Sequence, residues 1–405
     1  MHNSNLEMSS PEYLHNAERI LKELVRSGHR IVRASLRGNP VYIVTDMSLA
    51  KQIFEDARNF SFSPNPITED DSLTDGVRAF IREGLESPLV SSSYDDYREI
   101  RNLFNQAFRH CVTNEMERIR ALAKKHIATL LDGERGEHID ALALSRNYWL
   151  PLAADVIGLG SLSLAELHLL GDSARVLVEA NGLHGDAESV KALAGANKTL
   201  IDAIQKVIDA GAAPHNSALG YLLEHVGPER ALDVAFSFVL GGIDTGSSAL
   251  ALQTHLLAVN PDQREHFITL SETEQQNALT ELASKESPTY YTLRFAVRDT
   301  RIDDFDIPAG SFLHLALYSL NNCANPDFDI RRDQPSACPA HRNETLPFGH
   351  ARHRCPGETL ARYLMPVFLN ALFSRYGSVT VVSYKRLLNN FARSVSELIL
   401  QVAPR

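Results

Sequence analysis

The residues best suited to chemistry lie together in one short stretch, residues 348–357, which reads Phe-Gly-His-Ala-Arg-His-Arg-Cys-Pro-Gly. The cysteine is Cys355, and a cysteine thiolate is both a nucleophile and a soft metal ligand. Three basic side chains come directly before it, and cationic neighbours favour the thiolate. A helix that begins after Gly357 would also point backbone N–H groups at the sulfur and so tune its electron donation to a metal. On these residues alone, the alternative is a free cysteine in a basic surface turn.

A second unusual pattern, Gly-Gly-Ile-Asp-Thr at residues 241–245, lies inside the long apolar segment 228–259. Each glycine costs about 1 kcal/mol relative to alanine in a helix interior, and a carboxyl group in an apolar helix needs a polar partner. A threonine hydroxyl that bonds to a carbonyl one turn earlier bends a helix. We therefore expect a helix broken in its middle, with room for a small ligand beside Asp244 and Thr245. The alternative is a glycine packing contact beside a hydrogen-bonded core aspartate.

Helical periodicity dominates the elements that must position these groups. We expect helices over residues 11–27, 228–259, 272–286 and from 357 onward, and five helices between 94 and 211 with breaks near 109–111, 133–136, 158–161 and 181–185. A hairpin is expected at 31–36 and 41–45, further strands at 290–297, 311–317, 379–383 and 398–402, and a long irregular loop at 57–92. The sequence thus predicts a mainly α protein with a minor β portion, a single domain over 1–405 whose β-rich parts are about 29–45, 290–317 and 379–402.

Composition narrows the class of protein further. The 405 residues are 44% hydrophobic and 22% charged, which is ordinary for a globular protein and excludes a disordered or fibrous chain. A net charge of −10 argues against nucleic-acid binding, and four cysteines are too few for a disulfide framework. We expect a cytoplasmic protein, because no stretch is apolar enough for membrane insertion and the N-terminus lacks a secretory pattern.

Together the two motifs resemble those of the cytochrome P450 family. The family's haem loop, Phe-Gly-x-Gly-x-His-x-Cys-x-Gly, matches here at Phe348, Gly349, His353, Cys355 and Gly357, with Ala351 in place of one glycine. The family's helix motif, (Ala/Gly)-Gly-x-(Asp/Glu)-Thr, matches completely at residues 241–245. The resemblance covers nearly the whole chain and implies the P450 fold, a triangular helix-rich prism with a long central helix over haem.

The resemblance also implies a role for each matched residue. Cys355 corresponds to the thiolate ligand of the haem iron, and Phe348 and Gly357 belong to the same cofactor-binding loop. Asp244 and Thr245 correspond to the acid–alcohol pair that delivers protons during reduction of dioxygen.

Carboxylates of haem, its propionates, are held in this family by basic and polar side chains. His353 and Arg101 match such positions, Tyr97 stands where the family often has a histidine, and Arg294 resembles another propionate-binding arginine. Arginine suits this role because its planar fork matches a carboxylate.

One departure from the family pattern concerns the helix before the Ser287-Pro288 turn. The family carries Glu-x-x-Arg there, whereas this chain has Glu281-Leu-Ala-Ser284. We expect structural compensation, for which Lys285 is a candidate because it lies four residues after the glutamate. A relaxed or specialised member of the family is the alternative.

The implied reaction is that of a haem-thiolate monooxygenase, which inserts one oxygen atom of O2 into a small organic substrate. The cofactors would be haem b and O2, with electrons from NAD(P)H through ferredoxin reductase and ferredoxin, and the chain would act as a monomer. Five basic residues could form a docking face for the acidic ferredoxin: Arg98, Arg109, His110, Arg352 and Arg354. We favour a tailoring role in bacterial secondary metabolism, that is, natural product biosynthesis.

The substrate pocket is expected, by position in such a fold, to be lined by residues of two segments: Ser237, Leu240 and Gly241 on the long helix, and Thr289, Tyr290 and Tyr291 after the Ser-Pro turn. Their hydroxyl groups predict a pocket with polar contacts as well as apolar walls.

Two rival functions belong to other classes. One is a non-catalytic haem-binding homologue that acts as a scaffold or sensor, an idea motivated by the missing arginine at Ser284. The other is a zinc site built from His350, His353 and Cys355, which would leave the glycine-rich helix motif unexplained.

Overall fold

The computed structural model describes residues 2–36, 38–61, 94–179, 187–331 and 345–405, with side chains described for 6–36, 38–61, 98–179, 191–331 and 345–405. The helices are α1 (Pro11–Arg26), α2 (Met47–Glu55), α5 (Tyr94–Gly133), α6 (Ala141–Ile157), α7 (Leu164–Glu179), α8 (Ala187–Asp209), α9 (Ala218–Val226), α10 (Pro228–Ala258), α11 (Pro261–Thr269), α12 (Glu272–Lys285), α13 (Leu317–Ala324), the 3-10 turn η3 (Ala351–His353) and α14 (Glu358–Arg375). The predominance of helix agrees with the predicted fold class.

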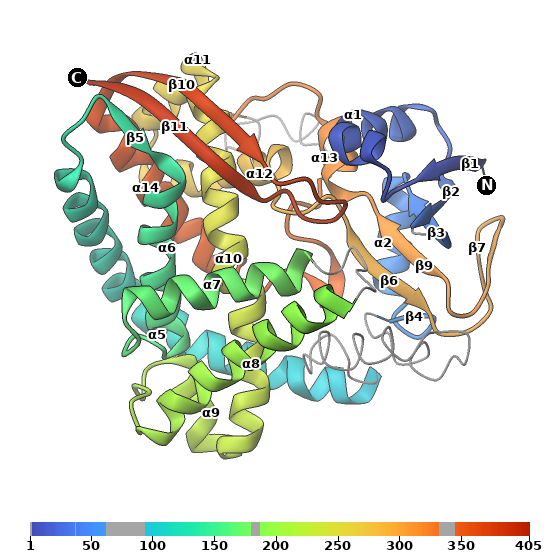
Figure 1. The fold of residues 1–405 in the computed structure, drawn as a ribbon, viewed down its shortest axis with the longest axis horizontal. Helices are drawn as coiled ribbons and strands as arrows, with labels where there is room; N and C mark the ends of the chain where they lie inside the picture. The colour runs from blue at the N-terminus through green and yellow to red at the C-terminus, as the bar shows by residue number, and fades with distance from the viewer. Residues whose placement is uncertain (1, 37, 62–93, 180–186, 332–344) are drawn as a thin grey trace.

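The strands form a smaller part of the molecule; most of them lie to the right in Figure 1, and the C-terminal pair lies at the upper left beside the helices. They are β1 (His2–Glu7), β2 (Ile31–Leu36), β3 (Asn39–Val44), β4 (Phe60–Ser61), β5 (His138–Asp140), β6 (Thr292–Ala296), β7 (Thr300–Ile302), β8 (Phe305–Ile307), β9 (Phe312–Leu315), β10 (Tyr376–Arg386) and β11 (Val395–Pro404). A six-stranded sheet has the order β1-β2-β3-β9-β6-β4, and β10-β11-β5 and β7-β8 pair separately. The predicted hairpin is present as the antiparallel pair β2 and β3.

Two helix starts illustrate how the sequence sets these boundaries. Ser10 caps α1 by accepting the backbone N–H of Tyr13, and Pro11 occupies the first turn, where its missing N–H costs nothing. At α12, Ser271 and Glu274 form a reciprocal capping box. Both helices therefore begin where their side chains satisfy the first backbone N–H groups.

Helix α5 corrects one prediction. The expected break near residues 109–111 is wrong, because α5 runs without interruption for 40 residues. The segment carries no proline and no glycine before Gly133, so nothing ends the backbone hydrogen-bond ladder. Cys111 and Val112 are buried within it and pack into the main core.

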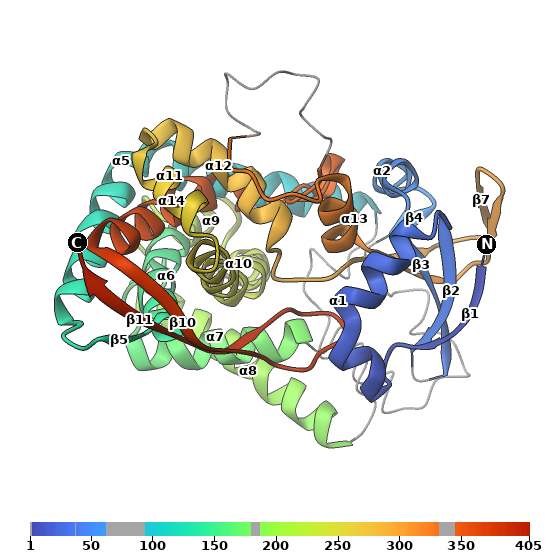
Figure 2. The same cartoon turned by 90° about the horizontal axis from the view of Figure 1, so that it is seen from above.

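Helix α10 forms the centre of the helical part and is seen nearly end-on in Figure 2, with helices around it. It contacts α6, α7, α8 and α9, and its side chains contribute heavily to the largest apolar cluster. The expectation that no stretch is apolar enough for membrane insertion is wrong for α10, whose length and hydropathy would suffice to cross a membrane. In the structure, however, 78% of its most apolar stretch is buried inside the protein. Such burial is typical of the core helix of a soluble fold.

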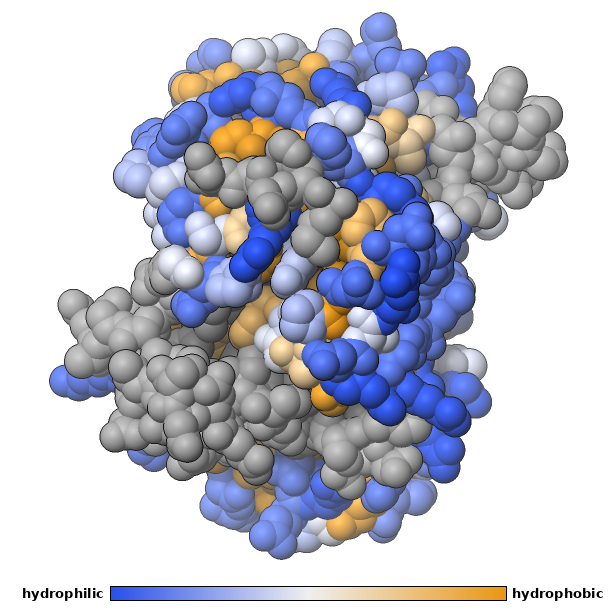
Figure 3. All heavy atoms as spheres, turned by 90° about the vertical axis from the view of Figure 1, so that its right-hand side faces the viewer, coloured by the Kyte–Doolittle hydropathy of each residue, from blue (hydrophilic) through white to orange (hydrophobic). Residues whose placement is uncertain are grey.

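Two smaller apolar clusters lie under the sheet, one between the sheet and α2 and one between the sheet and α1. On the face shown in Figure 3, hydrophilic side chains predominate among the described residues, and apolar ones appear in small groups. Most apolar side chains are thus used for internal packing, in the helical part and at the sheet.

Candidate functional site

The cysteine-containing segment folds as a tight loop before α14. The backbone N–H of Cys355 donates to the carbonyl oxygen of Phe348 at 2.7 Å, which closes the loop. Gly349 has φ +75°, a left-handed conformation that suits glycine. Ala351 has φ +52° at the position where the resemblance places glycine, so its Cβ is held in a conformation that side chains disfavour. The glycine of the family pattern therefore has a backbone reason, and this chain carries strain without it.

The Cys355 sulfur lies at the wall of a cavity of about 420 Å³. Its accessible surface opens into this cavity, which is itself enclosed by the surrounding elements, so the thiol is shielded from bulk water. Burial raises the pKa of the thiol, while hydrogen bonds from the backbone N–H groups of Gly357 and Glu358 oppose the rise. Without a bound metal cation the thiol thus stays protonated at neutral pH, whereas a metal cation at the sulfur would favour the thiolate.

Three arginines surround His353 beside the sulfur. Burial, together with the positive charges of Arg294, Arg101 and Arg352, lowers the pKa of His353 to about 2. Arg101, on α5, donates to the carbonyl oxygen of Arg354 at 2.5 Å, and Arg294, on β6, is buried with its guanidinium 4.7 Å from the ring centre of Phe54. This concentration of positive charge around His353, which lines the cavity, fits an anionic group such as a propionate.

Helix α10 provides another wall of the same cavity through Gly241, Gly242, Thr245 and Gly246. The expectation of a broken helix is wrong, because α10 is continuous from Pro228 to Ala258. Room arises instead because a Cβ on either Gly241 or Gly242 would meet nothing within 4 Å. The Thr245 hydroxyl does donate to the carbonyl oxygen of Gly241, one turn earlier.

Gly246 and Trp149 fix how α10 packs against α6. A Cβ on Gly246 would lie 2.0 Å from the indole of Trp149, so only glycine fits there. The indole Nε1 donates to the carbonyl oxygen of Gly242 at 2.8 Å. The glycine packing contact is thus made at Gly246, one residue after the 241–245 motif, and not at Gly241 or Gly242, whose Cβ positions are open.

Asp244 lies in a different environment from its neighbour. It is 5% exposed and does not line the cavity, whereas Thr245 does. Burial raises the pKa of Asp244 to about 6, and Arg175 and Arg146 partly oppose this rise. Both arginines also pair with Asp172 at 2.7 Å, and that carboxylate is 47% exposed. Asp244 accepts a hydrogen bond from the Ser248 hydroxyl at 3.4 Å, and its pKa allows it to change protonation state near neutral pH.

The other predicted site residues divide into two groups. The cavity is lined by Gly241, Thr289, Tyr291, Phe348, His353, Cys355 and Gly357, together with Thr245. Ser237, Leu240 and Tyr290 do not line this cavity. Ser237 is buried within α10, Leu240 packs against the main core, and Tyr290 packs near Tyr318 and Arg393. The side chain of Tyr97 and most of the loop 57–92 lie outside the described residues.

The structure also adds residues that sequence reasoning missed. Gln253, Glu286, Phe54 and Phe391 line the cavity. Gln253 lies eight residues after Thr245 on α10, so helical spacing could have predicted that the two side chains lie on the same face of the helix. Phe54 and Phe391 reach the cavity from distant parts of the chain, and no local pattern marks them.

Lys285 provides a positive charge one residue after Ser284, the position at which the family pattern has an arginine. Its ammonium nitrogen lies 4.0 Å from Oε1 of Glu281, and both side chains are buried. Lys285 also donates to the carbonyl oxygen of Asn325, and Glu281 accepts the backbone N–H of Asp329 at 3.3 Å. Ser284 is bonded instead to Thr280 and Thr345. Lys285 and Glu281 thus link α12 to the segment after α13, with the positive charge one residue later than in the family pattern.

The zinc alternative finds no support in this geometry. Nε2 of His350 lies 2.8 Å from a carboxylate oxygen of Glu55. No group of three or more His, Cys, Asp or Glu side chains is arranged to hold a metal within the part of the chain that the structure describes.

Comparison with known proteins gives one consistent answer. A family model described as Cytochrome P450 matches residues 278–397, which contain the Cys355 loop. The chain is 25% identical to cytochrome P450 FAS1 of Rhodococcoides fascians, covering 84% of each chain. The chain belongs to the cytochrome P450 family. It is accordingly an oxidoreductase of the P450 monooxygenase class, for which the family implies thiolate-ligated haem and O2.

Two further P450 relatives show how wide the likeness is. A C-19 steroid 1alpha-hydroxylase of Sorangium cellulosum is 25% identical, with 78% of this chain and 80% of that protein covered. The solved structure of epothilone D-bound cytochrome P450epoK superposes with a TM-score of 0.81 at 18% identity, over 99% of this chain and 100% of the other. The second comparison establishes the P450 fold for the whole chain.

Proposed function

We propose that this P450 is a haem-thiolate monooxygenase that inserts one atom of O2 into a small organic substrate during natural-product tailoring. The observation that carries the proposal is one cavity that contains both the Cys355 sulfur and the Thr245 segment of α10. Haem, when bound, supplies the activation of dioxygen. The chain's own residues then have to hold the cofactor, place the substrate and move protons.

Holding haem falls to residues of three elements. Cys355 would ligate the iron, with the N–H groups of Gly357 and Glu358 stabilising its thiolate. Arg101 and Arg294, whose charges act on His353, would bind the propionates. These donors match the cofactor in charge and chemistry, since a soft thiolate suits iron and guanidinium groups suit carboxylates.

Proton movement is assigned to Asp244 and Thr245. With a pKa of about 6, the Asp244 carboxyl can take up a proton from the Arg146–Asp172–Arg175 side and release it near neutral pH. The Thr245 hydroxyl faces the cavity and can donate a hydrogen bond there once it leaves the Gly241 carbonyl. We assign to this pair the transfer of protons between the protein exterior and the cavity.

Two features support the proposed partners and substrate class. Arg98 and Arg109 are exposed on α5, the helix whose Arg101 contacts the cysteine loop, so a ferredoxin docked there would lie close to the sulfur. The cavity combines apolar walls with Thr289, and one relative is named a steroid hydroxylase while a structural neighbour is bound to epothilone D. We infer an oxygenated natural product of medium size as substrate, with NAD(P)H as the electron source, in a cytoplasmic monomer.

The test begins with the reduced protein and carbon monoxide. A thiolate-ligated haem gives a strongly red-shifted absorption band, and a protein that binds no haem, or haem without this band, refutes the proposal. Turnover is then measured with a surrogate ferredoxin system: Thr245→Ala should uncouple NAD(P)H oxidation from product formation. Thr245→Ser is the matched control, because it keeps the hydroxyl and should stay coupled. A haem-loaded wild-type protein that shows no turnover would favour the scaffold or sensor alternative.

A further inference from the structure

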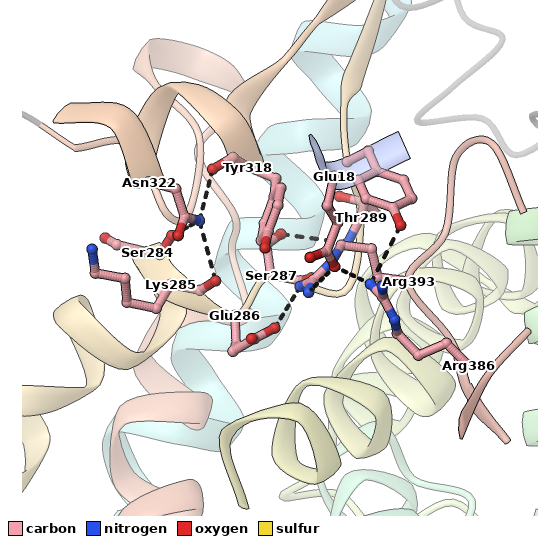
Figure 4. A network of polar contacts seen from close by, with 11 residues as sticks. Glu18, Ser284, Lys285, Glu286, Ser287, Thr289, Tyr318, Asn322, Arg386 and Arg393 are labelled. Carbon is pink, nitrogen blue, oxygen red and sulfur yellow. Dashed lines mark hydrogen bonds and ion pairs between the residues drawn. The ribbon is translucent and has the colours of Figure 1, made fainter. Parts of the chain in front are cut away.

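A buried cluster of charges joins the N-terminal helix to the end of α12 and to the connection between β10 and β11 (Figure 4). The side chain of Arg393 is 1% exposed, and its guanidinium lies 2.7 Å from Glu18 of α1 and 2.7 Å from Glu286, which follows α12. Arg386 pairs with the same Glu18 carboxylate. Although burial opposes it, the charges of Arg393 and Arg386 lower the pKa of Glu18 to about 2. Two carboxylates and two guanidinium groups thus form one interlocked unit.

The same arginine fixes the backbone of the Ser-Pro turn. Its Nη1 donates to the carbonyl oxygen of Ser287 at 2.7 Å, and its backbone N–H donates to the carbonyl oxygen of Pro288 at 2.8 Å. Next to these bonds, the N–H of Tyr290 donates to the carbonyl oxygen of Phe391 at 2.9 Å. These three hydrogen bonds therefore hold the turn after α12 against the connection after β10.

Both of these segments form walls of the cavity. Ser287 and Thr289 line it from one segment and Phe391 from the other, while Arg393 does not line it. The rings of Tyr318 and Tyr290 lie 3.9 Å and 5.7 Å from the guanidinium carbon and enclose it further. A side chain confined in this way has one orientation, so the separation of the two walls depends on where Glu18 and Glu286 hold it.

We propose that Arg393 is a positioning residue for the substrate, oriented by Glu18, which sets the placement of Thr289 relative to Phe391. This inference rests on the proposed function, because it concerns the substrate cavity of that same site. Arg393 touches no substrate and acts through the two walls. Helix α1 thereby influences which part of a bound molecule faces the reacting centre.

The test compares two probes that ligate haem iron but differ in size. Imidazole is too small to depend on both walls, whereas 4-phenylimidazole carries a ring that must fit between them. Dissociation constants are measured from the shift of the haem absorption band in wild-type protein, Glu18→Gln and Arg393→Lys. We expect both variants to bind 4-phenylimidazole about tenfold more weakly, because small misplacements have large effects, and to bind imidazole within about twofold of wild type.

The matched control is Glu23→Gln, which removes a 57% exposed carboxylate from the same helix and should change neither constant. If Arg393→Lys does not fold, Glu18→Gln carries the test alone, because it removes only the partner's charge. Phe391→Ala gives a further check: adding Glu18→Gln to it should cause little additional loss of 4-phenylimidazole affinity. Equal weakening of both probes, or unchanged 4-phenylimidazole binding in Glu18→Gln, overturns the positioning role. A wild-type protein that binds neither probe would instead count against the proposed function.

Discussion

The pair of Glu281 and Lys285 offers the sharpest test of how this P450 manages without the usual arginine. Lys285→Met removes the ammonium group and keeps the length and apolar character of the stem. It leaves the carboxylate of Glu281, which is 0% exposed, without the charge that lies 4.0 Å away. At that separation, with an effective dielectric constant of about 20, the lost attraction is about 4 kcal/mol.

This loss can be converted into a melting temperature. Unfolding entropies of about 2.1 cal/mol/K per residue give about 0.85 kcal/mol/K for a chain of 405 residues. A destabilisation of about 4 kcal/mol should therefore lower Tm by about 5 °C. The measurement is thermal unfolding followed by circular dichroism, with the fraction of protein showing the thiolate-type CO band recorded in parallel.

A double-mutant cycle separates the pair from the individual substitutions. Glu281→Gln combined with Lys285→Met removes both charges, and we expect it to cost clearly less than the sum of the two single changes. The control is Lys198→Met, which removes a 75% exposed lysine and should leave Tm within about 1 °C. Additive single effects, or a Lys285→Met protein as stable as wild type, would show that the charge of Lys285 does not replace the missing arginine.

Three further predictions follow from the site. Ala351→Gly should stabilise the protein by about 1 kcal/mol, since it relieves the φ of +52°, and an unchanged or lower denaturant midpoint would contradict this. Gly246→Ala should destabilise by about 1–3 kcal/mol by forcing the Trp149 indole to move, whereas Gly241→Ala, with open space around its Cβ, should not lower Tm. Asp244 has a folded pKa raised from 3.8 to about 6, so its contribution to the free energy of unfolding should fall as pH rises between about 4 and 6. Asp244→Asn should remove this slope and the inflection of turnover near pH 6, and a variant that keeps both would refute the assignment.

Several features of the site could be predicted because they depend on neighbours in the chain. The Cys355 loop and the 241–245 motif each place their chemical groups within one turn or one helix face, so spacing alone indicates them. The hairpin of β2 and β3 and the ends of α1 and α12 follow from local turn and capping residues. The predicted break near residues 109–111 failed for the complementary reason, since no local helix breaker was present.

Tertiary structure decided what the motifs do together. The sequence by itself determined the family, the thiolate candidate and the Asp244–Thr245 pair, because each is encoded in a few adjacent residues. Only the fold placed Phe54, Phe391 and Glu286 at the cavity and excluded Leu240 and Tyr290 from its lining. Only the fold, too, placed Asp244 where the charges of Arg175 and Arg146 act on it, and brought Glu18 to Arg393, 375 residues later. Contacts of this kind depend on how helices and strands pack across large separations in the chain, and no local pattern of residue types records that packing.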